Sequence, residues 1–247
     1  FFAPDLVEEI EGRSYLRAAT RTYGASGIAG VWAEANTREA IYDAFRRKET
    51  FATSGTRIRL RFMAGYGFGP DLLEDADAMT EAWSQGVAMG GDLEARADAA
   101  PELVVWALAD PKGAPLQRLQ IVKGWVRGGD THEQVYDVAC SDGSAPDAAT
   151  HRCADNGASV DIEDCSTTPG SGAARLNAVW QDPDFEATES AFYYARVLEN
   201  PVCRWSTWDA LREGVPRRAD LPPTIQERAW SSPIGVVPFQ PEEPAAE

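Results

Sequence analysis

The densest group of side chains that could do chemistry lies in one polar segment, residues 140–165. It reads CSDGSAPDAATHRCADNGASVDIEDC, and its oxygen-bearing side chains are Asp142, Asp147, Asp155, Asn156, Asp161, Glu163 and Asp164. Calcium binds about six to eight such oxygens, so a Ca site in this loop is one interpretation. The spacing of an EF-hand loop is absent, and the alternative is an ordinary solvated loop held by disulfide bonds.

The four cysteines favour disulfide bonding in this segment. Their spacings are too wide for a paired CxxC zinc site, and His132 and His151 do not complete a Cys/His set. An even number of cysteines around a long loop is typical of an oxidising compartment, which predicts an exported protein, periplasmic or extracellular. Four cysteines allow three connectivities, and the pairs that we expect are Cys153 with Cys165 and Cys140 with Cys203.

Two further motifs have both a chemical and a structural interpretation. In MGGDL, residues 89–93, the glycines allow close backbone approach and Asp92 could bind a cation or an amino group. The alternative is a tight turn closed by the Asp92 side chain. Arg57, Arg59 and Arg61 alternate with apolar residues, which predicts a half-exposed strand. These arginines could bind an anion; the alternative is solvated charge on an exposed strand face.

The composition describes an acidic globular chain. In 247 residues, 44% apolar and 10% aromatic content supplies a hydrophobic core. A net charge of −16 repels phosphate backbones and anionic lipids, which argues against nucleic-acid binding and membrane docking. No apolar run reaches the roughly 20 residues that span a bilayer, so we expect no membrane span. The P-loop, HExxH and GxSxG motifs are also absent, which argues against those enzyme classes.

The fold class is predicted to be α+β and mostly β. Runs rich in β-branched and aromatic residues predict strands at residues 102–110, 116–126, 133–139, 175–182 and 190–199. Helical turns are predicted at residues 78–83 and 205–213. Short strands in series, separated by turn residues, are typical of a β-sandwich.

The N-terminal part has a different pattern. Residues 13–23 are predicted to be weakly helical or loop-like, and the apolar run GIAGVWA at residues 27–33 predicts a buried strand. Asn36, followed three residues later by Glu39, predicts a helix start, and the segment TFATSG predicts a turn into the next strand. One strand–helix unit cannot bury both faces of a parallel sheet, so we expect it to need neighbours that are not in this sequence.

Several segments together resemble the DUF3604 family, which belongs to the PHP superfamily of metal-dependent hydrolases. They occur in consistent order over residues 27–234 and read GIAGVWAEANTREAIYDAFRRKETFATSGTRI, MGGDL, LQRLQIVKGWV, YDVACSDG, NGASVDIEDC, VWQDPDFE, AFYYARVLENPVCRWSTWDALREGV and TIQERAWSSPI. The resemblance implies a parent protein with a PHP-like α/β barrel. Divalent metals (Zn, Mn or Fe) bound in that barrel activate water against a phosphoester or a related ester.

The resemblance also implies a domain organisation. Residues 1–56 are the C-terminal end of an incomplete PHP-like domain, residues 57–234 form a β-rich sandwich-like domain with the disulfide loop, and residues 235–247 form an acidic, Pro-rich tail. The HxH and DxH metal motifs of such proteins precede the stretch that is matched here. We therefore expect no metal ligand in this chain.

The resemblance points to candidate site residues as well. Barrel enzymes place functional groups at the carboxyl ends of their strands, which makes Glu34 and Asn36 the expected catalytic positions. Capping of the helix is the alternative role of Asn36. Thr53, Ser54 and Arg57, at the turn that leaves the barrel, are secondary candidates.

The expected function is that of the C-terminal part of an exported metal-dependent hydrolase, inactive by itself. The expected partners are the missing barrel portion or another subunit, together with a small ester substrate. The alternative is a non-catalytic, β-rich binding or assembly subunit of a larger exported complex.

Overall fold

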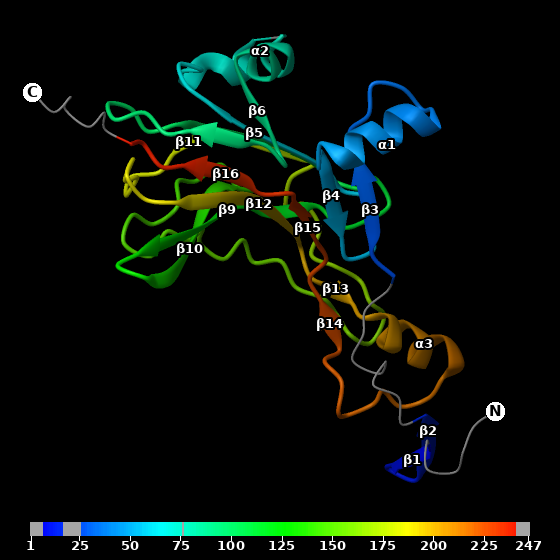
Figure 1. Ribbon diagram of the computed structural model, residues 1–247. Helices are drawn as coiled ribbons and strands as arrows, with labels where there is room; N and C mark the ends of the chain where they lie inside the picture. Colours follow the sequence, from blue (N-terminus) through cyan, green and yellow to red (C-terminus); the bar gives the residue numbers. More distant parts are fainter. Residues whose placement is uncertain (1–6, 17–25, 76, 241–247) are drawn as a thin grey trace, which may run out of the picture.

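The computed structural model describes residues 7–16, 26–75 and 77–240, and in these ranges the chain is mostly β (Figure 1). The strands form an eight-stranded sheet, a four-stranded sheet and two two-stranded sheets, and none of these described sheets closes into a barrel. The prediction of a mostly β chain is therefore confirmed.

The larger sheet contains strands from both sides of the boundary expected at residue 56. Its order is β10 (Asp130–Cys140), β9 (Leu116–Arg127), β12 (Ala191–Glu199), β15 (Arg228–Ser231), β4 (Thr50–Thr53) and β3 (Ile28–Val31), with β16 (Ile234–Val237) beside β12 and β7 (Asp92–Glu94) beside β16. The β16–β7 pairing is parallel and all the others are antiparallel. Strand β16 also enters the segment that was expected to be the acidic tail, of which residues 241–247 lie outside the described ranges.

The smaller sheets complete the β structure. The four-stranded sheet has the order β11 (Arg175–Gln181), β8 (Glu102–Leu108), β5 (Arg59–Gly65) and β6 (Gly86–Ala88). Strand β13 (Val202–Cys203) pairs with β14 (Thr224–Ile225), and β1 (Val7–Ile10) pairs with β2 (Arg13–Leu16). The β1–β2 hairpin shows that the prediction for residues 13–16 was wrong, and residues 17–23 of that prediction lie outside the described ranges.

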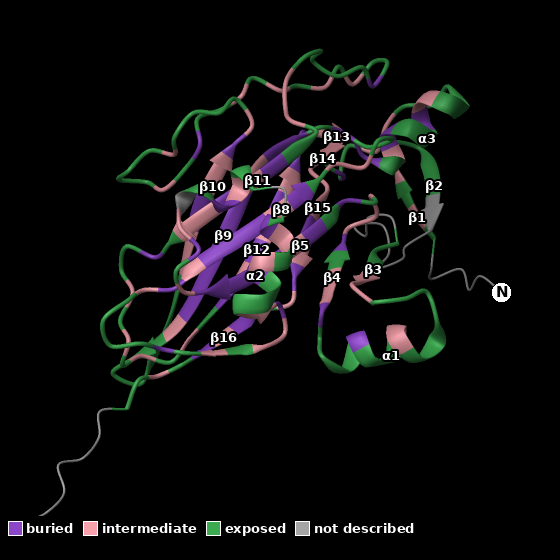
Figure 2. Ribbon diagram, turned by 90° about the horizontal axis from the view of Figure 1, so that it is seen from above, coloured by how far each residue is buried: buried purple, intermediate pink, exposed green. Residues whose placement is uncertain are grey.

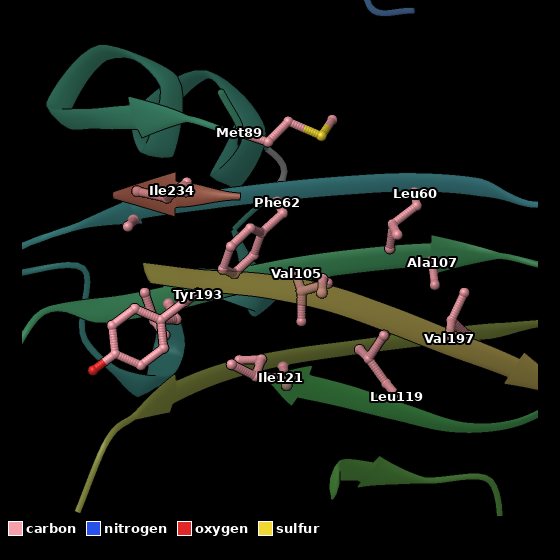
Figure 3. Packing of buried hydrophobic residues seen from close by; sticks show 14 of the residues in the cluster. Leu60, Phe62, Met89, Val105, Ala107, Leu119, Ile121, Tyr193, Val197 and Ile234 are labelled. Atoms are coloured by element: carbon pink, nitrogen blue, oxygen red, sulfur yellow. The ribbon is translucent and has the colours of Figure 1, made fainter. Parts of the chain in front are cut away.

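The main core lies between the two larger sheets. Apolar side chains of β5 and β8, such as Phe62 and Val105, pack in one cluster with Leu119 and Ile121 of β9 and with Tyr193 of β12 (Figure 3). All five are fully buried. Figure 2 shows how burial follows the central strands, β9 in particular. Alternation of buried and half-exposed residues along β12 reflects the period of two that defines a strand.

The predicted strands at residues 102–110, 116–126, 133–139, 175–182 and 190–199 are all confirmed, as β8 to β12. Helix α3 (Trp205–Glu213) also has the predicted bounds, and it ends at Gly214, whose φ of 62° is the left-handed conformation that glycine adopts most readily. Helix α2 (Ala78–Gln85) and the short 3₁₀ helix η3 (Pro70–Glu74) share a second apolar cluster with the outer face of the four-stranded sheet.

The strand–helix unit differs from its prediction in three respects. Strand β3 is exposed or half-buried rather than buried, because it is the last strand of its sheet in the described ranges. It pairs antiparallel with β4, which was expected to be a turn. Helix α1 (Arg38–Arg46) is capped by Thr37, whose Oγ1 accepts a hydrogen bond from the Ala40 amide at 3.2 Å, so the prediction of a start at Asn36 was one residue early.

The disulfide pairing differs from the expected one. The bonds join Cys140 to Cys153 and Cys165 to Cys203, each with a Cα–Cα distance of 5.6 Å. The reason is Asp137 on β10, whose buried carboxylate accepts a hydrogen bond from the Cys153 amide at 2.8 Å. This contact folds the loop back onto β10 and brings Cys153 beside Cys140. Cys165 is left to join the loop to β13.

We predict that peptide mapping without reduction will find these two pairs. Cleavage before aspartate separates all four cysteines into peptides 137–141, 147–154, 164–181 and 184–208. The expected linked species join 137–141 to 147–154 and 164–181 to 184–208. A linked species of 147–154 with 164–181 would instead support the pairing expected from the sequence and contradict the contact between Asp137 and Cys153.

Candidate functional site

The residues predicted as sites lie at two opposite ends of the β3–β4 pair. The register places Ile28 opposite Thr53 and Val31 opposite Thr50. Because the strands run in opposite directions, the segment after Val31 and the segment after Thr53 leave the sheet at different ends. Glu34 and Asn36 are therefore not brought together with Thr53, Ser54 and Arg57.

At the carboxyl end of β3, Glu34 and Asn36 are both exposed. The ordered groups near them are Trp32, whose Nε1 donates to the Leu60 carbonyl at 2.8 Å, and Arg47, whose Nε lies 2.6 Å from Glu49 Oε1. The hydrogen bond that Arg47 donates to Glu49 raises the pKa of Arg47, with smaller electrostatic contributions that include Glu34. At this end of the sheet, an exposed carboxylate (Glu34) and an ion pair (Arg47 with Glu49) therefore accompany the fixed indole of Trp32.

At the exit turn, Thr53 and Ser54 hold the backbone in place. Thr53 is buried, and its Oγ1 donates to the Thr56 carbonyl at 2.6 Å and accepts from the Gly55 amide at 3.2 Å. Ser54 Oγ donates to the Glu227 carboxylate and accepts from the Arg228 amide at 2.9 Å. These hydroxyl groups are engaged in closing the turn and in joining it to the start of β15.

The same turn contains acidic groups from other elements. The Arg57 amide donates to Asp110 Oδ2 at 2.8 Å, and Glu199 follows Tyr193, Ala195 and Val197 on the buried face of β12. Glu199 is fully buried, and its Oε2 accepts only a long hydrogen bond, of 3.3 Å, from the Ala114 amide. The sequence interpretation missed this residue, although extending the alternation of β12 by one step would have found it.

Glu199 is a carboxyl group in an environment that disfavours its charge. Its Oε1 and the Thr56 Oγ1 are both buried, and neither has a partner in hydrogen-bonding geometry. Burial raises the pKa of Glu199 to about 7; nearby Glu227 and Asp110 add to this, while Thr56 and Ala114 oppose it. Glu199 can therefore take up or release a proton near neutral pH, which is the property of a general acid or base and also of a pH-sensitive structural contact.

A second polar group, Lys123, lies inside the main core. The sequence interpretation missed this residue as well. Lys123 continues the buried alternation of Leu119 and Ile121 on β9, and it forms an ion pair with Asp182. Tyr193 OH donates to the same carboxylate at 2.7 Å. Burial and the Asp182 charge raise the pKa of Tyr193 far above its ordinary value. This network fixes the loop between β11 and β12 onto the sheet.

A hollow of about 420 Å³ lies beside this loop and is lined by Trp125, Tyr136, His151 and Asp184 among other residues. The Tyr136 and His151 rings are 4.8 Å apart, and the Tyr136 hydroxyl donates to Asp184 at 3.3 Å. The lining also includes Arg127, Gln134 and Glu186, so it combines aromatic rings with polar and charged side chains. The hollow therefore suits a small ligand that offers both polar groups and an apolar face.

The acids of the cysteine loop are engaged with the loop itself. Asp142, Asp147, Asp155, Asp161 and Asp164 each accept a hydrogen bond from a backbone amide two residues further on. Such contacts stabilise turns. Across the described ranges, no group of three or more His, Cys, Asp or Glu side chains is arranged to hold a metal ion. A calcium site in this loop stays a prediction.

The MGGDL motif lies in neither cluster. A Cβ atom at Gly90 would lie 2.5 Å from the Lys48 carbonyl oxygen, so the close approach that its glycine allows is to the turn after α1. The Asp92 side chain lies against Gly235 of the paired strand β16, where a Cβ atom would clash with Asp92 Oδ1. Both features stabilise packing between neighbouring segments.

The raised pKa of Glu199 predicts a dependence of stability on pH. Between pH 4.5 and about 7 the folded state keeps this proton while the unfolded state releases it, so the free energy of unfolding falls as pH rises through this window. The full shift corresponds to about 3 kcal/mol. We expect a change on the order of 2 kcal/mol in the free energy of unfolding.

Substitution Glu199→Gln removes this proton equilibrium and keeps the shape of the side chain. The free energy of unfolding of the variant, relative to that of the wild type, is expected to rise from pH 5 to pH 8, as measured by urea denaturation at both values. Because the two proteins are compared at each pH, titrating groups that do not interact with Glu199 cancel. Glu213→Gln, at an exposed position of α3, is the control and should keep the pH dependence of the wild type. Equal pH dependence in the wild type and in Glu199→Gln would refute the raised pKa.

Comparison with known proteins adds one finding. The profile of a family described as a protein of unknown function, DUF3604, matches residues 4–238. No curated protein and no solved structure matches the chain. Because the matched stretch covers nearly the whole sequence, the chain belongs to the DUF3604 family.

Proposed function

We propose that this chain is the C-terminal part of an exported metal-dependent hydrolase of the PHP type, whose metal ligands lie on residues outside this sequence. In such an enzyme, metal-bound hydroxide attacks a phosphoester or a related ester, and the metals stabilise the developing negative charge. Membership of the DUF3604 family supports the proposal through the resemblance of this family to PHP enzymes.

The observation that carries the proposal is the uncovered apolar face of the strand–helix unit. Tyr42 and Phe45 of α1 are 61% and 48% exposed, and Ile28 of β3 is 38% exposed. Tyr42 and Phe45 are three residues apart and so lie on one side of the helix. Exposed aromatic groups on one helix face are typical of a surface that another part of the protein covers. The remaining strands and helices of a PHP-like barrel would cover it.

In this proposal the rest of the chain is a sandwich-like domain that follows the barrel. The main core, to which both larger sheets contribute apolar side chains, supports this part of the proposal. The two disulfides support export, because such bonds persist in oxidising compartments. Within the described ranges, no helix is both long and apolar enough to cross a membrane.

The test compares this chain with the longer product of its source gene. We predict that the longer product carries HxH and DxH motifs before Phe1, binds divalent metal stoichiometrically, and hydrolyses a phosphoester such as p-nitrophenyl phosphate. The isolated chain is expected to show neither property when metal content is measured by mass spectrometry. Stoichiometric transition metal together with turnover by the isolated chain would contradict the proposal, as would a source gene without those motifs.

A variant of α1 tests the covered face directly. Phe45→Ser is expected to change the unfolding free energy of the isolated chain by less than about 1 kcal/mol, because the side chain is already about half exposed there. In the longer product the same substitution should lower the free energy of unfolding by about 1–3 kcal/mol more than in the isolated chain, because the ring is then buried. Arg46→Ser, one residue further along the same helix, is the matched control. Equal effects of Phe45→Ser in both proteins would show that nothing covers this face.

The second candidate function is a non-catalytic binding subunit, and the hollow beside the β11–β12 loop favours it. Its lining by Trp125, Tyr136 and His151 suits a small ligand with apolar faces and hydroxyl groups. An intact mass of the natural protein that corresponds to a chain starting at Phe1 would favour this role over the hydrolase.

A further inference from the structure

The outer face of the four-stranded sheet presents a row of arginines. Arg59 and Arg61 point to this face from β5, and Arg175 lies on β11 opposite Leu108, which in turn lies opposite Arg59. Arg59 and Arg175 are exposed, whereas Arg61 is half-buried. A solvated arginine needs no special explanation, so only Arg61 calls for one.

Two tryptophans hold the guanidinium group of Arg61. Its Cζ lies 4.7 Å from the centroid of the Trp32 ring and 5.3 Å from that of the Trp83 ring. Trp32 is fixed by its hydrogen bond to the Leu60 carbonyl, and Trp83 lies on α2, which is anchored by the buried Ala78 and Ala82. The cation–π contacts therefore set the position of the guanidinium before any ligand arrives.

The guanidinium has no acceptor in the part of the chain that the structure describes. The acid that contributes to its electrostatics is Glu49, and the Glu49 carboxylate is already bonded to Arg47 at 2.6 Å. Burial lowers the pKa of Arg61, and Glu49 offsets this only in part. None of its nitrogens is a buried unpaired atom, so the N–H groups that lack acceptors face solvent. Arg61 is thus partly desolvated, oriented and unpaired.

We propose that Arg61, held by Trp32 and Trp83, binds an oxyanion, either the phosphate or the carboxylate group of a small molecule. The two rings occupy space beside the guanidinium and leave its remaining N–H groups free. A guanidinium matches two oxygens of one phosphate or carboxylate group through parallel hydrogen bonds. Such charge-assisted bonds are stronger than neutral ones, and part of the ordering cost has already been met by the contacts to the rings.

The net charge of −16 does not prevent binding at this position. At physiological ionic strength, exposed charges separated by more than about 8 Å are largely screened. Of the nearby acids, Glu49 is compensated by Arg47, and Arg59 on the same strand adds positive charge. The local field at Arg61 is therefore set by cations and by an ion pair.

The test is a titration of the whole chain followed by ¹H–¹⁵N spectra at constant ionic strength, with phosphate, acetate and chloride as separate probes. The indole N–H signals of Trp32 and Trp83 and the Nε–H signal of Arg61 are expected to shift and to saturate, with a dissociation constant on the order of 1 mM for two charge-assisted bonds. Saturation with phosphate alone assigns a phosphate site, and saturation with acetate alone assigns a carboxylate site. Saturation with both assigns a general oxyanion site.

Variants separate binding from a purely structural stack. Arg61→Gln should weaken binding at least tenfold, and Arg61→Lys, which keeps the charge but loses the planar donor pair, should weaken it less. Arg59→Gln, on the same face of the same strand, should leave the dissociation constant within twofold.

Shifts no larger than those with chloride, or equal shifts in Arg61→Gln, would overturn the proposal. A wild-type chain that binds none of the probes while Arg61→Gln lowers stability would overturn it too, because the stack would then serve packing alone. The proposal concerns this chain by itself, so its outcome does not depend on where the hydrolytic centre of the proposed enzyme lies.

Discussion

The pairing of β4 with β15 is the interaction on which the arrangement of this chain depends. Three residue pairs, from Thr53 with Ala229 to Phe51 with Ser231, join the strand–helix unit to the β-rich sheet. The ladder is extended at one end by the Ser54 amide, which donates to the Arg228 carbonyl at 2.9 Å, and at the other by the Ser232 amide, which donates to the Thr50 carbonyl at 2.8 Å. These contacts give β3 and α1 a fixed place, which leaves the aromatic face of α1 uncovered and sets Trp32 beside Arg61.

Two charged residue types, lysine and glutamate, lie inside the core, and each is accommodated there in a different way. Lys123 and Glu199 both continue the buried alternation of central strands, so both would place a charge in an apolar interior. Lys123 has Asp182 as a partner, and this pair anchors a loop. Glu199 forms no ion pair with any residue that the structure describes, and its carboxyl group instead holds its proton more tightly, which links the exit turn to pH. The Lys123–Asp182 ion pair therefore adds rigidity, whereas Glu199 adds a contact that titrates.

The sequence predicted the long elements well because their patterns are local. Strands β8 to β12 and helix α3 have strong apolar patterns of their own, whereas β15 and β16 are short and are defined by their neighbours in the sheet. The disulfide pairing was missed because it depends on the contact of Asp137 with the Cys153 amide, which no spacing reveals. Thr53 and Ser54 were expected in one turn, but Thr53 is the last residue of β4, and antiparallel pairing of β3 with β4 separates both residues from Glu34 and Asn36.

Native-state hydrogen exchange tests most directly whether the strand–helix unit and the β-rich sheet are one cooperative structure. Exchange of the Ser54 and Ser232 amides reports on the β4–β15 joint, and amides of the β9–β12 ladder report on the core. If the pairing joins both parts, all of these amides exchange with opening free energies within about 1 kcal/mol of one another, through global unfolding. Exchange of Ser54 and Ser232 at an opening cost several kcal/mol lower would show that the strand–helix unit separates from the sheet, which contradicts the account.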